Sequence, residues 1–196
     1  KNLIKNEGWM IMPIIPYGDP VLRKETKEVD EKYPELEQLI ENMFATMEGA
    51  SGVGLAAPQI GLPIRIFIVD TSPFAEEYPE LDGFVKVFIN PIIHEESGEK
   101  WTFNEGCLSI PGIREDVERH PNLTIEYFDR DWNLIEEDYG GIIARVIQHE
   151  YDHIEGILFT DLISGFRKRV LKGKLKDIEN GDVDVTYKMR YPIRKK

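Results

Sequence analysis

The chain has 196 residues, the size of one domain at ~150 residues each, and its 41% hydrophobic and 31% charged residues exclude an intrinsically disordered protein. The formal net charge of −12 disfavours general nucleic-acid binding, and the apolar stretches are too short for a transmembrane helix, so we expect no membrane partner. The single cysteine, Cys107, excludes an intramolecular disulfide and favours a reducing compartment, the cytoplasm.

The first half of the chain is predicted to form one helix and two strands. Residues 1–9 show no pattern, and we expect a disordered or upstream-derived extension there, ahead of one domain over residues 10–196. Apolar residues at helical spacing predict an amphipathic helix over residues 34–47, which a glycine-rich loop follows. Short apolar runs predict strands over residues 64–69 and 85–90.

The second half is predicted to contain a hairpin, two helices and a last strand. Alternating apolar residues indicate a hairpin with strands over residues 123–128 and 134–139. Helices are expected over residues 142–154 and 161–178, the latter with an apolar face of Leu162, Phe166, Val170 and Leu175. After a turn at Asn180, alternation predicts a final strand over residues 183–189.

The strongest local signal is the pattern H-E-x-x-H at residues 149–153. His149 and His153 are four residues apart on the predicted helix, so both imidazoles can reach one metal ion. Glu150 lies beside them and can hold a water bound to that ion. Two ordinary surface histidines are the alternative, which is disfavoured because the whole motif is rare by chance.

The third ligand decides what such a site does. A metzincin extends the motif with a glycine and a third histidine, but Phe159 occupies the histidine position. A gluzincin uses a downstream glutamate, and the nearest candidate, Glu179, lies beside a turn. A lone cysteine is often only a small buried apolar residue. Beside two histidines that lack a partner, however, Cys107 is the favoured ligand, and three ligands leave a position open for water and hydrolysis.

At this point the chain resembles a known family, the bacterial peptide deformylases. The resemblance rests on GVGLAAPQIG at residues 52–61, EGCLS at residues 105–109 and QHEYDH at residues 148–153, in that order. YGDPVLR at residues 17–23 resembles the N-terminal segment of the family. The implied fold is α+β: a single compact domain of antiparallel strands around a central H-E-x-x-H helix, with a C-terminal helix and strand.

The resemblance implies removal of the N-formyl group from the formylmethionine of new polypeptides, with release of formate. Cys107, His149 and His153 would hold one divalent metal ion, natively Fe²⁺, although Zn²⁺, Ni²⁺ or Co²⁺ can occupy such a site. Glu150 would pass a proton from water to the departing amine. The side-chain amide of Gln59 and the backbone N–H of Leu108 would stabilise the oxyanion.

The resemblance also implies how N-formylmethionyl peptides bind. Glu105 would orient a neighbouring group, and the residues expected to contact substrate are Val53, Gly54, Gly106, Arg114, Ile142 and Val146. The backbones of the first three would bind the peptide. The helix face of Ile142 and Val146 would line the methionine pocket.

Two segments depart from short family members: an acidic stretch at residues 71–83 looks inserted, and from Glu179 onward the motifs give no guidance. From residue 165 to the end, eleven Lys and Arg stand against four Asp and Glu. Such a basic helix on an acidic body suggests docking to ribosomal RNA, and a solvated helix face is the alternative.

The competing functions are a zincin-like metallopeptidase and a ribosome-associated binding protein with a non-catalytic metal site.

Overall fold

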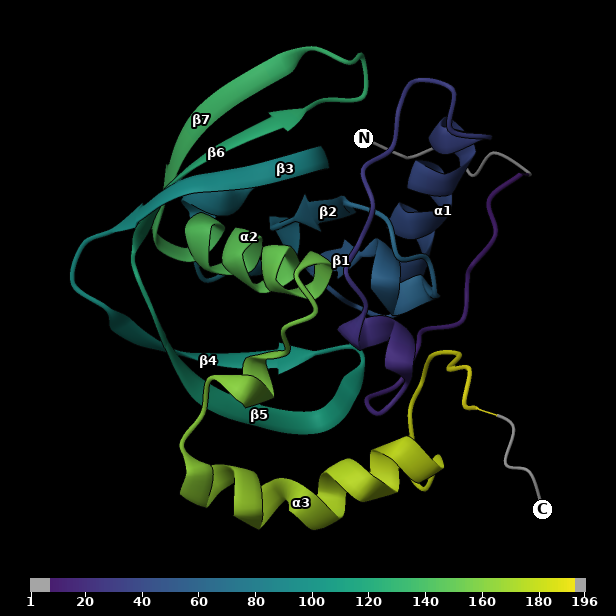
Figure 1. The fold of residues 1–196 in the computed structure, drawn as a ribbon. Coiled ribbons are helices and arrows are strands. Elements are labelled where there is room, and N and C mark those ends of the chain that lie inside the picture. Colours follow the sequence, from purple (N-terminus) through teal and green to yellow (C-terminus); the bar gives the residue numbers. More distant parts are fainter. Residues whose placement is uncertain (1–7, 193–196) are drawn as a thin grey trace.

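Five antiparallel strands form the larger of two sheets (Figure 1). They lie in the order β1 (Gly54–Ala56), β2 (Ile66–Asp70), β3 (Val85–Ser97), β6 (Asn122–Phe128) and β7 (Leu134–Gly140). The computed structural model describes residues 8–192. Most of the predicted extension over residues 1–9, and the basic residues Arg194, Lys195 and Lys196, therefore lie outside the described residues.

Helices cover both faces of this sheet. Alternate side chains of β2 point to opposite faces, so Ile66 and Ile68 pack in the same cluster as α1 (Leu36–Gly49), while Phe67 and Val69 pack with α2 (Gly141–Ile154). Because both faces are buried, the β2 sequence is apolar almost throughout. The helix that carries the H-E-x-x-H motif is thus held against the sheet on one side.

A smaller sheet lies on the other side of α2 (Figure 1). It is a hairpin of β4 (Trp101–Cys107) and β5 (Ile110–Arg119), in which Cys107 pairs with Ile110 and leaves Leu108 and Ser109 in the turn. Along β5 the hairpin packs against α3 (Gly165–Asn180), where Ile113 and Val117 share a buried cluster with Leu171 and Leu175. The arrangement places the end of β4 beside the C-terminal half of α2.

The α+β prediction is confirmed, and most predicted elements are found, although β3 extends to Ser97, well past its predicted end at residue 90. The helices predicted over residues 34–47 and 142–154 are α1 and α2, and four of the five predicted strands correspond to β2, β3, β6 and β7. Strands β1, β4 and β5 have no counterpart in the sequence prediction. Within residues 8–192, no helix combines the length and apolar character needed to cross a bilayer.

The prediction is wrong in two places near the C-terminus. The strand expected over residues 183–189 is a single parallel bridge between Ile14 and Met189, because the rest of this segment crosses the protein surface without a pairing strand. The apolar face expected on the last helix is mostly exposed. Leu162, Phe166 and Val170 face solvent, whereas Leu175 of the predicted face is buried, together with Leu171 and Ile178. The helix begins at residue 165, where the Ser164 side chain caps it.

Candidate active site

Three metal-ligating side chains meet where the end of β4 lies beside α2. Cys107 Sγ is 3.3 Å from His153 Nε2, and ligand atoms of Cys107, His149 and His153 all lie within 4.8 Å of one another. One thiolate and two imidazoles suit a divalent transition metal, and three protein ligands leave a coordination position open. The predicted Cys-His-His set is therefore brought together in a form that fits a metal ion.

The two histidines have opposite electrostatic surroundings. Burial lowers the pKa of His153 well below its usual value, and the charge of His149 lowers it further, so this imidazole is neutral and ready to ligate. Burial also lowers the pKa of His149, but hydrogen bonds with Cys107 and Glu105 outweigh it and raise the pKa well above the usual value. A metal ion would take the place of the proton on His149.

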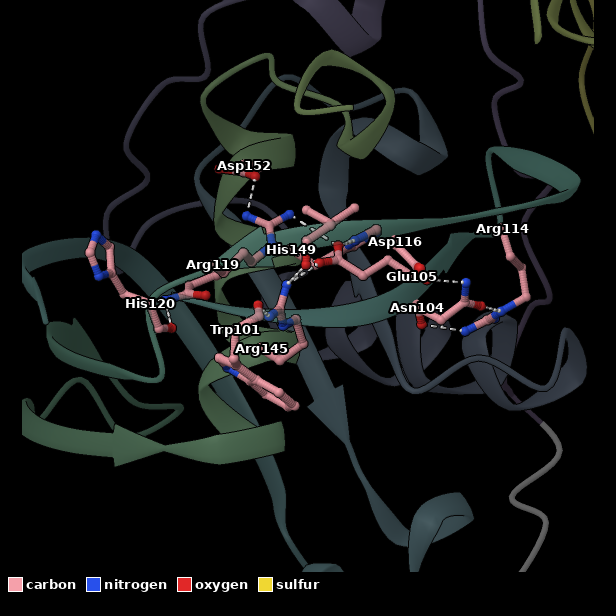
Figure 2. A network of polar contacts seen from close by, with 12 residues as sticks. Trp101, Asn104, Glu105, Arg114, Asp116, Arg119, His120, Arg145, His149 and Asp152 are labelled. Atoms are coloured by element: carbon pink, nitrogen blue, oxygen red, sulfur yellow. Dashed lines mark hydrogen bonds and ion pairs between the residues drawn. The ribbon is translucent and has the colours of Figure 1, made fainter. Parts of the chain in front are cut away.

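The His149 ring is oriented by a buried carboxylate. Glu105 Oε1 lies 2.8 Å from His149 Nδ1, which leaves Nε2 of that ring to face a metal. Arg119 donates to both oxygens of Glu105, at 2.8 and 3.0 Å, and Arg145 donates to Oε2 at 2.9 Å. Figure 2 shows both guanidinium groups and the His149 ring converging on this one carboxylate.

Glu105 is ionised although it is only 5% exposed. Burial alone would raise its pKa, but hydrogen bonds with His149 and Arg119 outweigh burial and hold the pKa well below its usual value. Arg119 also donates to Asp152 on α2, at 2.7 Å. The carboxylate thus links β4, β5 and the metal-binding face of α2.

The sequence prediction does not include Arg119 or Arg145, although the position of each on its strand or helix indicates a buried side chain. Arg119 continues the inward-facing alternation of Ile113 and Val117 along β5, and Arg145 lies one helical turn before His149. An arginine in an inward-facing position indicates a buried, paired charge, because an unpaired charge there is strongly destabilising.

Glu150 faces the same centre. Its side chain is buried, and its Oε2 atom has no hydrogen-bond partner among the described residues. Burial raises the pKa of this carboxyl to about 7. A Cβ added to Gly54 would lie 2.6 Å from Glu150 Oε1, so the carboxylate rests directly against the Gly54 backbone. A glycine is therefore required there for Glu150 to keep this position.

Gln59 is fixed on η2 (Ala57–Ile60), which follows β1. Its Oε1 accepts from the Ala56 N–H at 2.9 Å, which settles the direction of the amide. Its Nε2 donates to Ser109 Oγ at 3.2 Å and to Cys107 Sγ at 3.4 Å. The donor end of the amide thus lies beside the candidate metal ligand.

A cavity of about 590 Å³ opens beside these groups. Five of the six residues predicted to contact substrate line it, namely Val53, Gly54, Gly106, Arg114 and Val146, and Leu108 lines it as well. Arg114 is held across Gly106 by hydrogen bonds from its guanidinium to the side chain and carbonyl of Asn104 (Figure 2). Ile142 is not among the lining residues and instead packs with the core of the larger sheet.

Two unpredicted segments also line the cavity. The acidic stretch at residues 71–83 folds into the short turns η3 (Ser72–Phe74) and η4 (Pro79–Leu81), and Phe74 is part of the cavity wall. Residues 184–187, after α3, form another part. Both segments are far in sequence from the predicted motifs, and only the folded chain brings them to the cavity.

The residues that would define the other zinc-peptidase classes are placed elsewhere. Phe159, at the third-histidine position of a metzincin, stacks on the His149 ring with a centroid distance of 6.0 Å. Glu179, the gluzincin candidate, pairs with Lys176 on α3. Neither supplies a ligand to the Cys107, His149 and His153 set.

The Glu105 cluster generates a first prediction. Glu105→Gln should weaken metal affinity about 10- to 100-fold, because the carboxylate that orients His149 is lost. It should also lower the free energy of unfolding by about 3 kcal/mol, since Arg145 loses its carboxylate partner and Arg119 keeps only Asp152. Chelator competition and denaturant unfolding measure the two effects.

Glu115→Gln is the matched control, because Glu115 lies opposite Glu105 in the β4–β5 pair but binds the half-exposed Arg167. It should leave metal affinity unchanged. Parent-like metal affinity in Glu105→Gln would contradict the orienting role.

The sequence and fold of this chain match one known family. The family model described as polypeptide deformylase matches residues 11–169. The peptide deformylase of Christiangramia forsetii is 59% identical over 194 residues, covering 95% of this chain and 99% of that protein. The one from Flavobacterium psychrophilum is 55% identical, with 95% and 100% covered.

Solved structures agree with this match. The Legionella pneumophila peptide deformylase has a TM-score of 0.78 at 35% identity and covers 88% of this chain and 98% of its own. The Thermotoga maritima enzyme has a TM-score of 0.71 at 39% identity, with 79% and 99% covered. The chain therefore belongs to the peptide deformylase family, metal-dependent hydrolases that remove the N-formyl group from the first residue of new polypeptides.

Proposed function

We propose that Cys107, His149 and His153 hold one divalent metal ion at the catalytic centre of this deformylase. The observation that supports this most directly is the convergence of their three ligand atoms within 4.8 Å, beside a cavity that Glu150 and Gln59 also line. When bound, such an ion supplies Lewis-acid chemistry and makes hydroxide available near neutral pH.

Glu150 is the proton-transfer group in this proposal. The unpartnered Oε2 atom accepts the proton of the attacking water and then delivers it to the nitrogen of the departing amine. Burial supports this role, because a carboxyl with a pKa of about 7 can both accept and release a proton at neutral pH.

Gln59 and Leu108 stabilise the negative charge that develops on the formyl oxygen. Gln59 Nε2 is fixed through Oε1 and is aimed at the Cys107 side of the site. The Leu108 N–H is the next backbone donor after Cys107, in the turn between β4 and β5. Donors held in place before the reaction need no reorganisation as the charge forms.

The cavity takes the formylmethionyl end of the substrate. The backbones of Val53, Gly54 and Gly106 line it and are available for hydrogen bonds with the peptide, and Arg114 lies on the same side as Gly106. Val146 and Phe74 supply apolar wall for the methionine side chain. Ile142 packs against the core of the larger sheet, so we leave it out of the proposed pocket.

We propose Fe²⁺ as the native ion, as the family resemblance implies, because one thiolate with two imidazoles accepts Fe²⁺ as well as Zn²⁺, Ni²⁺ or Co²⁺. A zincin-like peptidase is disfavoured because a cysteine takes the third ligand position. A non-catalytic metal site is disfavoured because it would need neither Glu150 nor Gln59.

We also propose that α3 docks to the ribosome in the cytoplasm, where nascent chains emerge. Arg169, Lys172 and Lys174 are exposed on α3 and can contact phosphates of ribosomal RNA. Phe166 and Val170 are exposed beside them rather than buried in the core. Packing against the core therefore does not account for the apolar residues on this face of α3. Arg167 is unsuited to docking because it pairs with Glu115 on β5.

Glu150→Ala should lower formate release from a formyl-Met peptide about 10²- to 10⁴-fold while metal content stays the same, because a proton-transfer group is lost. Formate assays and metal analysis of the same preparation measure both. Glu155→Ala, at the exposed end of the same helix, is the control and should retain parent activity. Near-parent turnover in Glu150→Ala would refute the assignment.

Air should inactivate the iron-loaded enzyme faster than the nickel-loaded enzyme. Fe²⁺ and the Cys107 thiolate can both be oxidised, whereas divalent nickel resists oxidation. Protein purified without oxygen should contain iron, and residual formate release after timed exposure gives the two rates. Equal rates would mean that the metal is not the sensitive group.

Replacing Arg169, Lys172 and Lys174 together by Glu should reduce co-sedimentation with ribosomes at low salt and leave activity on a free formyl-peptide unchanged. Parent binding should itself weaken as salt rises, because phosphate contacts release counterions. Reversal of Lys27, Lys32 and Lys100, exposed elsewhere on the molecule, is the control for net charge. If the α3 variant binds as well as the parent, α3 is not the docking surface.

A further inference from the structure

The tail that follows α3 returns to the active site. The helix ends at Asn180, and Gly181 reverses the chain with a φ of 79°. The tail then runs beside the N-terminal segment (Figure 1), where the Ile14 N–H donates to the Lys188 carbonyl and the Arg190 N–H donates to the Ile14 carbonyl, both at 2.9 Å. These bonds fix the position of the tail on either side of Met189.

Tyr187 is held by this anchor against the turn between β4 and β5. Its hydroxyl donates to the Leu108 carbonyl at 2.7 Å, across 79 positions of sequence. Its ring is partly buried and forms part of the cavity wall. Burial, and then the charge of Cys107, raise the pKa of this phenol, so it stays protonated and remains a donor.

The same turn is held from two other directions. The Tyr17 N–H donates to the Ser109 carbonyl at 2.8 Å, and Gln59 Nε2 donates to Ser109 Oγ at 3.2 Å. The Tyr187 hydroxyl binds the carbonyl of Leu108, the residue that precedes Ser109 in the turn. The turn is short, since Cys107 already pairs with Ile110. Each of these contacts therefore limits how far its peptide groups can rotate.

We propose that Tyr187 is a positioning residue. It fixes the Leu108 backbone so that the Leu108 N–H stays directed toward the oxyanion. This inference rests on the proposed role of the Leu108 N–H. Cys107 would anchor that residue on its N-terminal side when it ligates a metal, and the Tyr187 hydroxyl anchors it on the carbonyl side. An oxyanion donor is effective only when its direction is fixed beforehand, because reorienting it during the reaction costs free energy.

The chain offers a matched pair of variants. Tyr187→Phe removes the hydroxyl that binds the Leu108 carbonyl and keeps the ring in the cavity wall. Tyr191→Phe removes a second hydroxyl from the same tail, one that contacts Met189 Sδ at 3.3 Å and is not part of the cavity. Comparing them separates an effect on Leu108 from a general effect on the tail.

Tyr187→Phe should lower kcat for formate release about five- to ten-fold, the effect of one lost hydrogen bond, with KM, metal content and Tm close to the parent values. Tyr191→Phe should match the parent in all four. A parent protein that releases no formate would refute the proposed function itself. With an active parent, an unchanged kcat in Tyr187→Phe would overturn the positioning role. A lower Tm together with a raised KM would also overturn it, because the hydroxyl would then only stabilise the fold.

Discussion

The carboxylate of Glu105 is enclosed by Arg119, Arg145 and the His149 ring, and an ionised carboxylate so deeply buried is stable only with partners of this kind. Its partners come from β5 and α2, while Glu105 itself lies on β4, two residues before Cys107. One interaction therefore holds the smaller sheet against the helix and sets Cys107 opposite the two histidines. Glu105 is therefore needed both to hold the hairpin against α2 and to place the candidate metal ligands.

The two sides of α2 have different functions: one packs on the larger sheet, and the other carries the candidate metal ligands. One side, with Ala144, Ile147 and Ile154, packs on the larger sheet and stabilises the helix. The other side presents Arg145, His149 and His153 at successive helical turns toward the hairpin of β4 and β5. The apolar contact fixes the helix axis, and the polar contact fixes its rotation. A helix fixed in both respects can hold ligand atoms in a constant geometry.

Two segments near the ends of the described chain, residues 14–17 and 187–190, meet beside the catalytic site. The extended segment at residues 14–17 donates from Ile15 to the Gln59 carbonyl at 2.7 Å and from Tyr17 to the Ser109 carbonyl. Through Ile14 it also pairs with the C-terminal tail. The groups proposed to stabilise the oxyanion are thus braced by segments far apart in sequence. Phe74, from the acidic stretch, also lines the cavity although it is far from the other lining residues in sequence.

The sequence by itself determined the helices, most strands of the larger sheet and the metal-binding character of His149 and His153. Their spacing is local, and the hydrogen bonds of a helix convert a four-residue interval into a shared face. The ordered motifs also indicated the family. Only the tertiary structure decided that Arg119 and Arg145 enclose Glu105, that α3 buries Leu171 rather than Val170, and that residues 184–187 line the cavity. Side chains alternate along any extended segment, so alternation cannot say whether a neighbouring strand, a cavity or solvent lies beside it; long-range packing makes that choice.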